Sequence, residues 1–458
     1  MRLVRILPLP LLGAGMLGVV LAAPPASPPS PPLVAATKTV TAATPGIQLS
    51  PTIPADVTAS GSTLAALQPG FDVFSWNSFI AVSWPPGPGG GGDPTRQPGA
   101  GPTGDNLTVW EGWRSAPEVF LPGGKTPSWD GPVEIPAACK AQYQTGMKVL
   151  QQVGKTPDLL TAATQAFSTG PLVDQNRAYT RFQVVLNRGM FDYILGNTLY
   201  SKAGQQAFTG PVKFPCGGGN QVGAIMIKAA WKVIGAHDDP GRFHTASALV
   251  YTPPQASPPV KESCVRQTVG LVGFHIGHKV NSAPQWVWST FEQVDNVPTQ
   301  ADVTGGRLAP HYNYYDPACK DCPANAAPPR PWIPNAGTSP PTQVVRVDVL
   351  PDFAASSAAA QNRTAQALLR QVSPKSVWQY YELISTQWPT DPGPGPCTAS
   401  ATDPRGNPAP QFLANTTLET YVQGSTPKVS SSCIDCHGDA AMTTGAASDF
   451  TYLLQRAH

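Results

Sequence analysis

Four segments in the middle of the chain have the pattern of β-strands and follow one another closely. They run over residues 225–233, 243–251, 265–278 and 286–294. In the first two, the more apolar side chains occupy alternate positions, which is the period of a strand with one buried face. Because the connections are short, we expect successive strands to pair antiparallel. A fifth strand is expected at 344–349.

Helical periodicity flanks this strand region on both sides. Apolar residues at steps of three and four predict helices at 71–80, 141–167, 176–200, 361–372 and 413–423. With 53 Pro and 43 Gly residues, much of the remaining chain is expected to be loop. The sequence therefore predicts an α+β fold: a loop-rich body with a mostly antiparallel sheet and flanking helices, followed by a short C-terminal segment.

The N-terminus has the pattern of a secretory signal. Arg2 and Arg5 precede an apolar stretch that ends in small residues. We expect cleavage after Ala22 or Ala23, so that residues 1–23 form a signal peptide. The alternative is that the apolar stretch is kept as a membrane anchor, because its length is about that of a short span.

The rest of the chain divides into three parts. Residues 24–45 are rich in Pro, Ser and Ala and are expected to be an extended linker. Residues 46–410 carry the predicted sheet and most helices and form the body, and residues 411–458 form the C-terminal segment. Since no later stretch is long and apolar enough for a transmembrane helix, we expect no stable membrane span after signal cleavage.

The charges of the mature chain balance. Cleavage removes Arg2 and Arg5 from the 30 Lys and Arg residues, which leaves as many basic residues as the 28 Asp and Glu. Nucleic acids and anionic membrane surfaces are bound through basic patches. Neither is therefore an expected partner.

The C-terminal segment contains the motif Cys433-Ile434-Asp435-Cys436-His437. C-x-x-C-H is the attachment signature of c-type haem. The two thiols add to the vinyl groups of the porphyrin, and the adjacent imidazole becomes an axial ligand of the iron. We therefore expect one covalent haem c, bound through Cys433 and Cys436, with His437 as the proximal ligand. The alternatives are a disulfide, or half of a zinc site that needs further ligands at matching spacing.

Six further cysteines support export. An even number of spare thiols in an oxidising compartment predicts up to three disulfides, here among Cys139, Cys216, Cys264, Cys319, Cys322 and Cys397. Cys319 and Cys322 are a candidate local bridge, or else two unpaired thiols in a loop. Haem is attached covalently outside the bacterial cytoplasm, so the signal, the cysteines and the motif all predict a periplasmic or secreted protein.

Three more motifs accompany C-x-x-C-H. They are W-x-W-S-T-F-E at 286–292, E-T-Y-V-Q at 419–423 and S-D-F-T-Y-L-L at 448–454. With them the chain resembles, over most of its mature length, a group of exported bacterial proteins described only as cytochrome c family proteins. The resemblance implies a single C-terminal haem on a large N-terminal body and implies no particular activity.

The second axial ligand departs from the common pattern of c-type cytochromes, in which a Met follows several dozen residues after the motif. Only 21 residues follow His437, and their one Met, Met442, is too close in sequence to reach the opposite face of the porphyrin easily. The body should therefore supply any distal ligand. The candidates are His237, His244, His275, His278, His311, Met147, Met190 and Met226.

His275 is the first of these candidates and His278 the second. One face of the strand at 269–279 is expected to carry Val269, Leu271, Gly273, His275 and Gly277. The other face is expected to be ordinary core, with Val272, Phe274 and Ile276. Because His275 stands between two glycines, a flat macrocycle has room to approach it. A purely structural strand histidine, or a distal position with no protein ligand, remains open.

Three functions are compatible with one exported haem. The first hypothesis is an electron carrier that serves a redox partner protein, although about 430 mature residues exceed what a simple carrier needs. The second is a peroxidase-like or oxidase-like enzyme that takes a small-molecule substrate at an open distal site, with catalytic residues unknown. The third is a sensor in which a gas displaces a weak ligand. G-x-S-x-G, H-E-x-x-H and Walker motifs do not occur.

Overall fold

A computed structural model describes residues 46–99, 107–150, 169–254, 256, 259–332, 339–347, 356–399, 403–423 and 431–458. The expected signal peptide (1–23) and linker (24–45) lie outside these residues. The described residues belong to the unit Thr41–His458. They form a mostly antiparallel open sheet with several helices, which confirms the predicted α+β class. Among the described residues, no helix is both long and apolar enough to cross a membrane.

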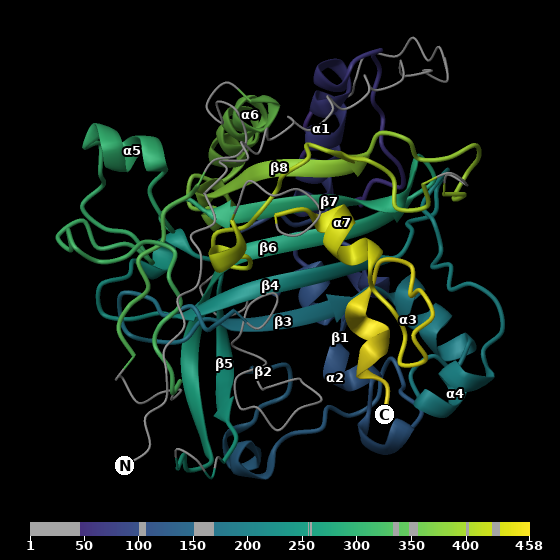
Figure 1. Ribbon diagram of the computed structural model, residues 1–458, viewed down its shortest axis with the longest axis horizontal. Coiled ribbons are helices and arrows are strands. Elements are labelled where there is room, and N and C mark those ends of the chain that lie inside the picture. The colour runs from purple at the N-terminus through teal and green to yellow at the C-terminus, as the bar shows by residue number, and fades with distance from the viewer. Residues whose placement is uncertain are drawn as a thin grey trace, which may run out of the picture. The chain divides into compact units, whose positions relative to one another are not determined.

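A nine-stranded sheet organises the described part of the chain (Figure 1). Its central path runs β1-β3-β4-β6-β7-β8-β9, and β5 pairs with both β6 and β2. All strand pairs are antiparallel except β2 with β5. The strands are β1 Arg114–Ser115, β2 Lys148–Leu150, β3 Arg181–Leu186, β4 Ile225–Val233, β5 Thr245–Thr252, β6 Ser263–Val280, β7 Ala283–Gln293, β8 Tyr381–Pro389 and β9 Pro408–Ala409.

The four strands predicted in the middle of the chain are confirmed as β4 to β7. β6 is the longest and joins the two parts of the sheet: its first half pairs with β5, and its second half pairs with β4 and β7. β8 extends the sheet beyond β7. β8 was not among the predicted strands, because the buried polar residues Ser385, Thr386 and Gln387 interrupt its apolar pattern.

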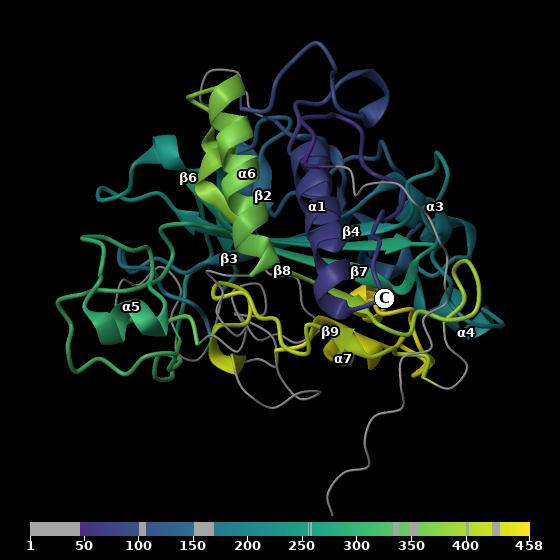
Figure 2. The same ribbon diagram turned by 90° about the horizontal axis from the view of Figure 1, so that it is seen from above.

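Helices lie on both faces of this sheet. They are α1 Leu64–Val82, α2 Ala116–Val119, α3 Arg188–Gly196, α4 Lys202–Ala207, α5 Gln300–Gly305, α6 Ser357–Val372 and α7 Cys433–Gly438. α1 and α6 cover one face, and α7 lies on the opposite face (Figure 2). The predicted helices at 71–80 and 361–372 are therefore confirmed within α1 and α6. Each begins at a capping hydroxyl, Thr63 and Ser356, that accepts a backbone hydrogen bond.

The main core lies between the sheet and the helices α1 and α6. Phe79 of α1 stacks on Phe291 of β7 with ring centroids 4.2 Å apart, and Trp76 meets the same ring edge-on. Phe274 and Ile276 of β6 belong to this core, as the sequence predicted. Burying each such side chain contributes about 1.5–3 kcal/mol, so this layer fixes the sheet on which the opposite face is built.

The helix predicted at 176–200 is half wrong. Its first part is strand β3, which pairs with β4 along its whole length. Asn187 then begins α3, because its side-chain oxygen accepts a hydrogen bond from the backbone N–H of Met190. The steps of three and four residues that predicted one helix thus span a strand and a helix.

The helix predicted at 413–423 is also wrong. The segment is a series of turns that ends in a 3₁₀ turn at Thr420–Val422. The Asn415 side-chain oxygen accepts hydrogen bonds from both the backbone N–H and the hydroxyl of Thr417. Such local side-chain bonds compete with the helical hydrogen-bond pattern.

Two predicted elements fall partly outside the described residues. The predicted helix 141–167 is described only to residue 150, and that part ends in strand β2 rather than in a helix. The predicted strand 344–349 is described only to residue 347, where it forms an isolated bridge between Thr299 and Arg346 instead of a ladder. Neither prediction holds where the structure describes the chain.

A bulge between β4 and β6 changes which β6 residues share a face. The register of the two strands slips there, and one extra residue reverses the alternation beyond it. Leu271 therefore packs in the core with Phe274, and Val272 packs in a different cluster. The faces predicted for Val269, Leu271 and Val272 are wrong, whereas the alternation of His275 with its neighbours holds.

Candidate functional site

The C-x-x-C-H motif forms helix α7, which lies over the edge of the sheet formed by β7 and β8 (Figure 1). The helix begins at Ser432, whose hydroxyl accepts a hydrogen bond from the N–H of Asp435. Gln387 of β8 fixes the first turn. Its side-chain oxygen accepts a hydrogen bond from the Ile434 N–H at 2.8 Å, and its amide donates to the Ser432 hydroxyl.

The two cysteines of α7 are the only unpaired ones among the eight, all of which are described. Burial raises the pKa of Cys433 well above its usual range and that of Cys436 to about 11. Both are therefore thiols at neutral pH, not the thiolates that bind metal ions. A thiol carries the hydrogen that addition to a vinyl group requires.

The other six cysteines stand in three pairs at disulfide distance. Their Cα atoms are 5.2, 6.1 and 5.6 Å apart, within the range of disulfides, for Cys139–Cys264, Cys216–Cys397 and Cys319–Cys322 respectively. The candidate local bridge is one of the three. The pairing gives each of these six cysteines a partner and leaves only the two cysteines of C-x-x-C-H unpaired.

His437 is held by its Nδ1 atom, which donates a hydrogen bond to the Phe450 carbonyl at 2.8 Å. This bond places the proton on Nδ1 and leaves the Nε2 lone pair for another partner. The ring packs against Trp288, at 4.3 Å between centroids, and against Tyr452, at 5.4 Å. Burial lowers the pKa of His437 to about 4, so the imidazole is neutral at pH 7.

A strained turn presents the Phe450 carbonyl to His437. Asp449 and Phe450 both have positive φ angles, 52° and 66°, which non-glycine residues rarely adopt. Asp449 is anchored by an ion pair with the buried Lys279 of β6 and by a 2.7 Å hydrogen bond from the Phe214 N–H. These contacts stabilise the turn.

Beneath α7 the sheet presents a row of polar side chains. Lys228 of β4, His275 of β6 and Thr290 of β7 are register partners, so they lie side by side on one face. The adjacent row contains Met226 and Trp288, and Trp288 contacts His437. His275, the first sequence candidate for a distal ligand, thus lies on the face that α7 covers.

Both ring nitrogens of His275 are engaged. Nε2 lies 3.0 and 3.1 Å from the two carboxylate oxygens of Glu419, and Nδ1 lies 3.1 Å from the Thr290 hydroxyl. Burial alone raises the pKa of Glu419, but the charge and hydrogen bond of His275 and the charge of Lys228 outweigh it and lower that pKa to about 2. Coordination through Nε2 therefore requires Glu419 to move away.

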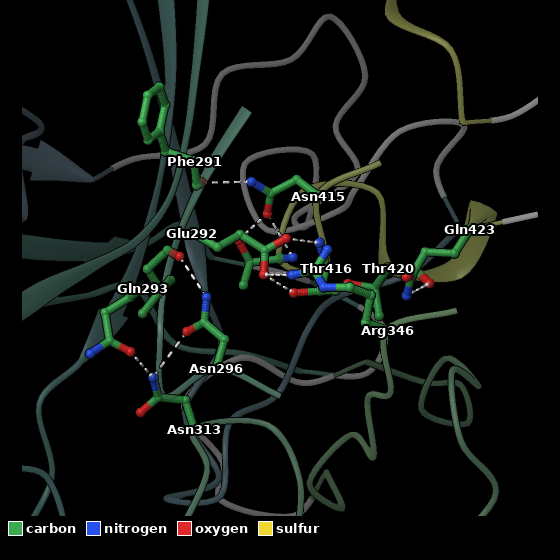
Figure 3. Close-up of polar contacts among 12 residues, drawn as sticks. Phe291, Glu292, Gln293, Asn296, Asn313, Arg346, Asn415, Thr416, Thr420 and Gln423 are labelled. Atoms are coloured by element: carbon green, nitrogen blue, oxygen red, sulfur yellow. Dashed lines mark hydrogen bonds and ion pairs between the residues drawn. The ribbon is translucent and has the colours of Figure 1, made fainter. Parts of the chain in front are cut away.

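A buried network holds the segment that carries Glu419 (Figure 3). Glu292 of β7 forms a 2.7 Å ion pair with Arg346 and accepts a 2.7 Å hydrogen bond from the Thr416 N–H. The Asn415 amide donates to the Phe291 carbonyl at 2.9 Å. Removing one partner of such a buried pair costs about 3–5 kcal/mol, so the position of the segment is well determined.

The glycines beside His275 do not serve a macrocycle. A side chain on Gly273 would meet Thr417 and Asn415. A side chain on Gly277 would meet Met226 at 3.2 Å and Trp288 at 3.3 Å. Protein side chains fill both positions, so the sequence-based reason for a haem over these glycines is wrong.

The structure distributes the other ligand candidates widely. His244 pairs with Glu111 and stacks on Trp378, His237 is exposed, and His311 is 44% exposed beside Asp238. His278 points to the opposite face, against Phe74 of α1, which argues against a ligand role. Met147 packs beside the Cys139–Cys264 pair, whereas Met190 of α3 packs in the same cluster as Met226 and Ile434 of α7. Only His275 and Met226 among the candidates lie on the sheet face under α7.

The four sequence motifs meet around α7. W-x-W-S-T-F-E supplies Trp288 and Thr290, E-T-Y-V-Q supplies Glu419, and S-D-F-T-Y-L-L supplies the turn that holds His437. The roles of Glu419 and Asp449 were missed from sequence, although both residues lie in motifs that pointed to them. Lys228 was missed because its only signal is an alternate position in a strand.

Comparison with known proteins adds no assignment. No protein-family model, curated protein or solved structure matches this chain. Among the described residues, no group of three or more His, Cys, Asp or Glu side chains is arranged to hold a metal ion.

Proposed function

We propose that this protein is an exported monohaem c-type cytochrome that transfers electrons. Cys433 and Cys436 bind one haem covalently, and His437 is its proximal ligand. The observation that carries the proposal is that the chain's two unpaired thiols share one helix with an imidazole whose Nδ1 is already bonded. A haem-binding histidine needs this tautomer, because the iron binds the other nitrogen.

The residues of α7 suit the attachment chemistry. Each thiol adds across one vinyl group: a C–S bond forms, and the thiol hydrogen passes to the other vinyl carbon, so no oxidant is consumed. The two-residue spacer places the sulfurs about one helical turn apart. The three disulfide pairs remove every other cysteine from competition, and an oxidising compartment outside the cytoplasm favours them.

The surroundings of α7 suit electron transfer. The bound haem supplies a one-electron redox couple. Trp288 and the Phe450 carbonyl hold His437 in one orientation, which limits rearrangement between oxidation states. On the outer side, Tyr452 is 41% exposed and donates a hydrogen bond to the Cys436 carbonyl. A redox partner protein can approach the attachment helix at this edge.

A haem enzyme or sensor is the second candidate, and one observation favours it. Lys228, His275 and Glu419 bring three ionisable side chains to the face under α7, as general acid–base chemistry requires. Optical and EPR spectra of the ferric protein separate the candidates. Low-spin iron in both oxidation states supports electron transfer, and high-spin iron supports catalysis or ligand binding.

Cysteine variants test the attachment. The protein is produced with its signal in a host that matures c-type cytochromes, and haem is stained after denaturing electrophoresis. We expect Cys433→Ala with Cys436→Ala to lose the stain. The matched control is Cys319→Ala with Cys322→Ala, which removes a C-x-x-C without a following His and should keep it. Covalent haem in the first double variant contradicts the proposal.

A further inference from the structure

A cavity of about 570 Å³ lies where β3 is left without a full strand partner. β1 pairs only with the last two residues of β3. β2 pairs with β5 and not with β3. Residues of all three strands line the cavity, together with Lys228 of β4 and Arg456 of the C-terminal segment. Its volume is in the range of small-molecule sites.

Two of the basic side chains in this cavity have acidic partners. Lys148 forms a 2.9 Å ion pair with Glu111, and Arg114 forms a 2.9 Å ion pair with Glu118. Within each pair the positive and negative charges offset each other, so little net charge is left to attract a ligand.

Lys228 differs from both. Its ammonium lies 5.4 Å over the ring of Phe182, and no described residue forms an ion pair or hydrogen bond with it. Burial lowers its pKa, the charge of Glu419 raises it, and the charge of Arg456 lowers it. Glu419 is itself bonded to His275. A partly buried cation without a direct anion is costly, and a bound anion offsets that cost.

A second cation, Arg456, lines the same cavity. Arg456 ends the 3₁₀ turn Tyr452–Arg456, in the same C-terminal segment as α7, and burial lowers its pKa. The two positive charges repel each other. An anion beside Lys228 would offset the repulsion that Arg456 exerts on it.

The Lys228 end of the cavity is next to the haem-attachment helix. Lys228 is the register partner of His275 on the sheet face that α7 covers, one row away from Trp288, which contacts His437. The anion that completes the site is therefore expected close to α7.

We propose that Lys228, with Arg456 beside it, binds a carboxylate at this end of the cavity, and that the carboxylate is a propionate of the haem attached to α7. The inference rests on the proposed function. A haem carries two propionates, and cations and hydrogen-bond donors hold such carboxylates. A small organic acid from solvent has the same chemistry, so the experiment must separate the two sources.

The test compares Lys228→Gln, Lys228→Arg and the exposed-lysine control Lys140→Gln, each in the haem-loaded protein. Resonance Raman spectra report the propionate bending modes, and redox titration reports the midpoint potential. We expect Lys228→Gln to shift the modes and to move the potential to more negative values, because a positive charge near the iron favours the ferrous state. Lys228→Arg and Lys140→Gln should resemble the wild type.

Acetate and succinate serve as probes of the second source. They are titrated into wild type and Lys228→Gln while the Raman modes and thermal stability are followed. No response in either protein is expected, because the propionate already occupies the site. Stabilisation of the wild type alone by acetate, with unchanged propionate modes in Lys228→Gln, overturns the assignment in favour of a free acid.

Two other outcomes separate a failure of this inference from a failure of the proposed function. If neither the modes nor the potential responds to Lys228→Gln and no probe binds, Lys228 is a structural residue and the inference fails. If the wild type carries no covalent haem, the proposed function itself fails. Covalent haem content measured on each variant separates these cases, since a propionate contact is not needed for thioether bonds to form.

Discussion

The Nδ1 atom of His437 is 2.8 Å from the carbonyl oxygen of Phe450, in a turn where both Phe450 and Asp449 have positive φ angles. A backbone strain of about 1–2 kcal/mol per residue persists only when surrounding contacts fix it. Here the ion pair of Asp449 with Lys279 does so, and it ties the turn to the central strand β6. The orientation of the His437 imidazole thus depends on the ion pair between Asp449 and Lys279.

Asp449→Ala should lower the free energy of unfolding by about 3–5 kcal/mol, because it leaves the buried Lys279 without its partner. Covalent haem should be retained, since the thioether bonds do not involve this turn. Urea denaturation measures the loss. The control is Asp192→Ala, which removes a surface pair with Arg188 and should cost less than about 1 kcal/mol. Equal effects in the two variants would show that the turn is not held by this pair.

The ferric protein should lack the near-infrared band of sulfur–iron ligation. The chain after His437 offers only Met442, which is buried among the side chains that pack against α7. Unless the body supplies a Met, we expect either His275 or no protein ligand at the distal position, and both arrangements give a reduction potential below that of His/Met cytochromes. Absorption spectroscopy is the measurement. If the band appears, Met226→Leu should remove it, because Met226 is the methionine on the face under α7.

His275→Ala should convert a low-spin ferric protein to high-spin while haem stays attached. Its Nε2 can reach a metal only if Glu419 moves, so Glu419→Gln should leave the iron low-spin. EPR distinguishes the two spin states. An unchanged spectrum in His275→Ala would make His275 a structural residue that pairs with Glu419.

His278 should make the fold acid-sensitive. Both ring nitrogens lack a hydrogen-bond partner within the described part of the chain, and burial lowers the pKa to about 3. The unfolded chain takes up a proton near pH 6.5 and the folded chain does not, so stability falls as pH decreases below 6.5. The loss reaches about 5 kcal/mol by pH 3. His278→Leu should remove this part of the pH dependence, and the exposed His237→Leu should not. Parallel stability–pH curves for wild type and His278→Leu would contradict the assignment.

The middle strands of the sheet were predictable from sequence because their signals are local. β4 and β5 alternate, and β4 to β7 follow one another closely, so local patterns located them. β3 was missed because Phe182 and Leu186 fit a helical period as well as a strand. The faces of Val269, Leu271 and Val272 were wrong because a bulge depends on the partner strand, which a single segment does not contain.

The motif itself was readable, whereas its surroundings were not. Cys433, Cys436 and His437 lie within five residues, so the spacing that predicts a covalent haem is a local pattern. The contact of His275 with Glu419 joins residues 144 positions apart. The Thr417 side chain, which occupies the space beside Gly273, is also far from that glycine in sequence. Such contacts depend on how loops pack over the sheet, and no local pattern encodes them.

The most direct test of the proposed function is mass spectrometry of the peptide that contains residues 433–437, obtained from the exported protein after denaturation and proteolysis. The account predicts that this peptide carries the mass of one haem, bound through two thioethers, and that no other peptide does. An unmodified peptide, or one in which Cys433 and Cys436 are joined by a disulfide, would contradict it.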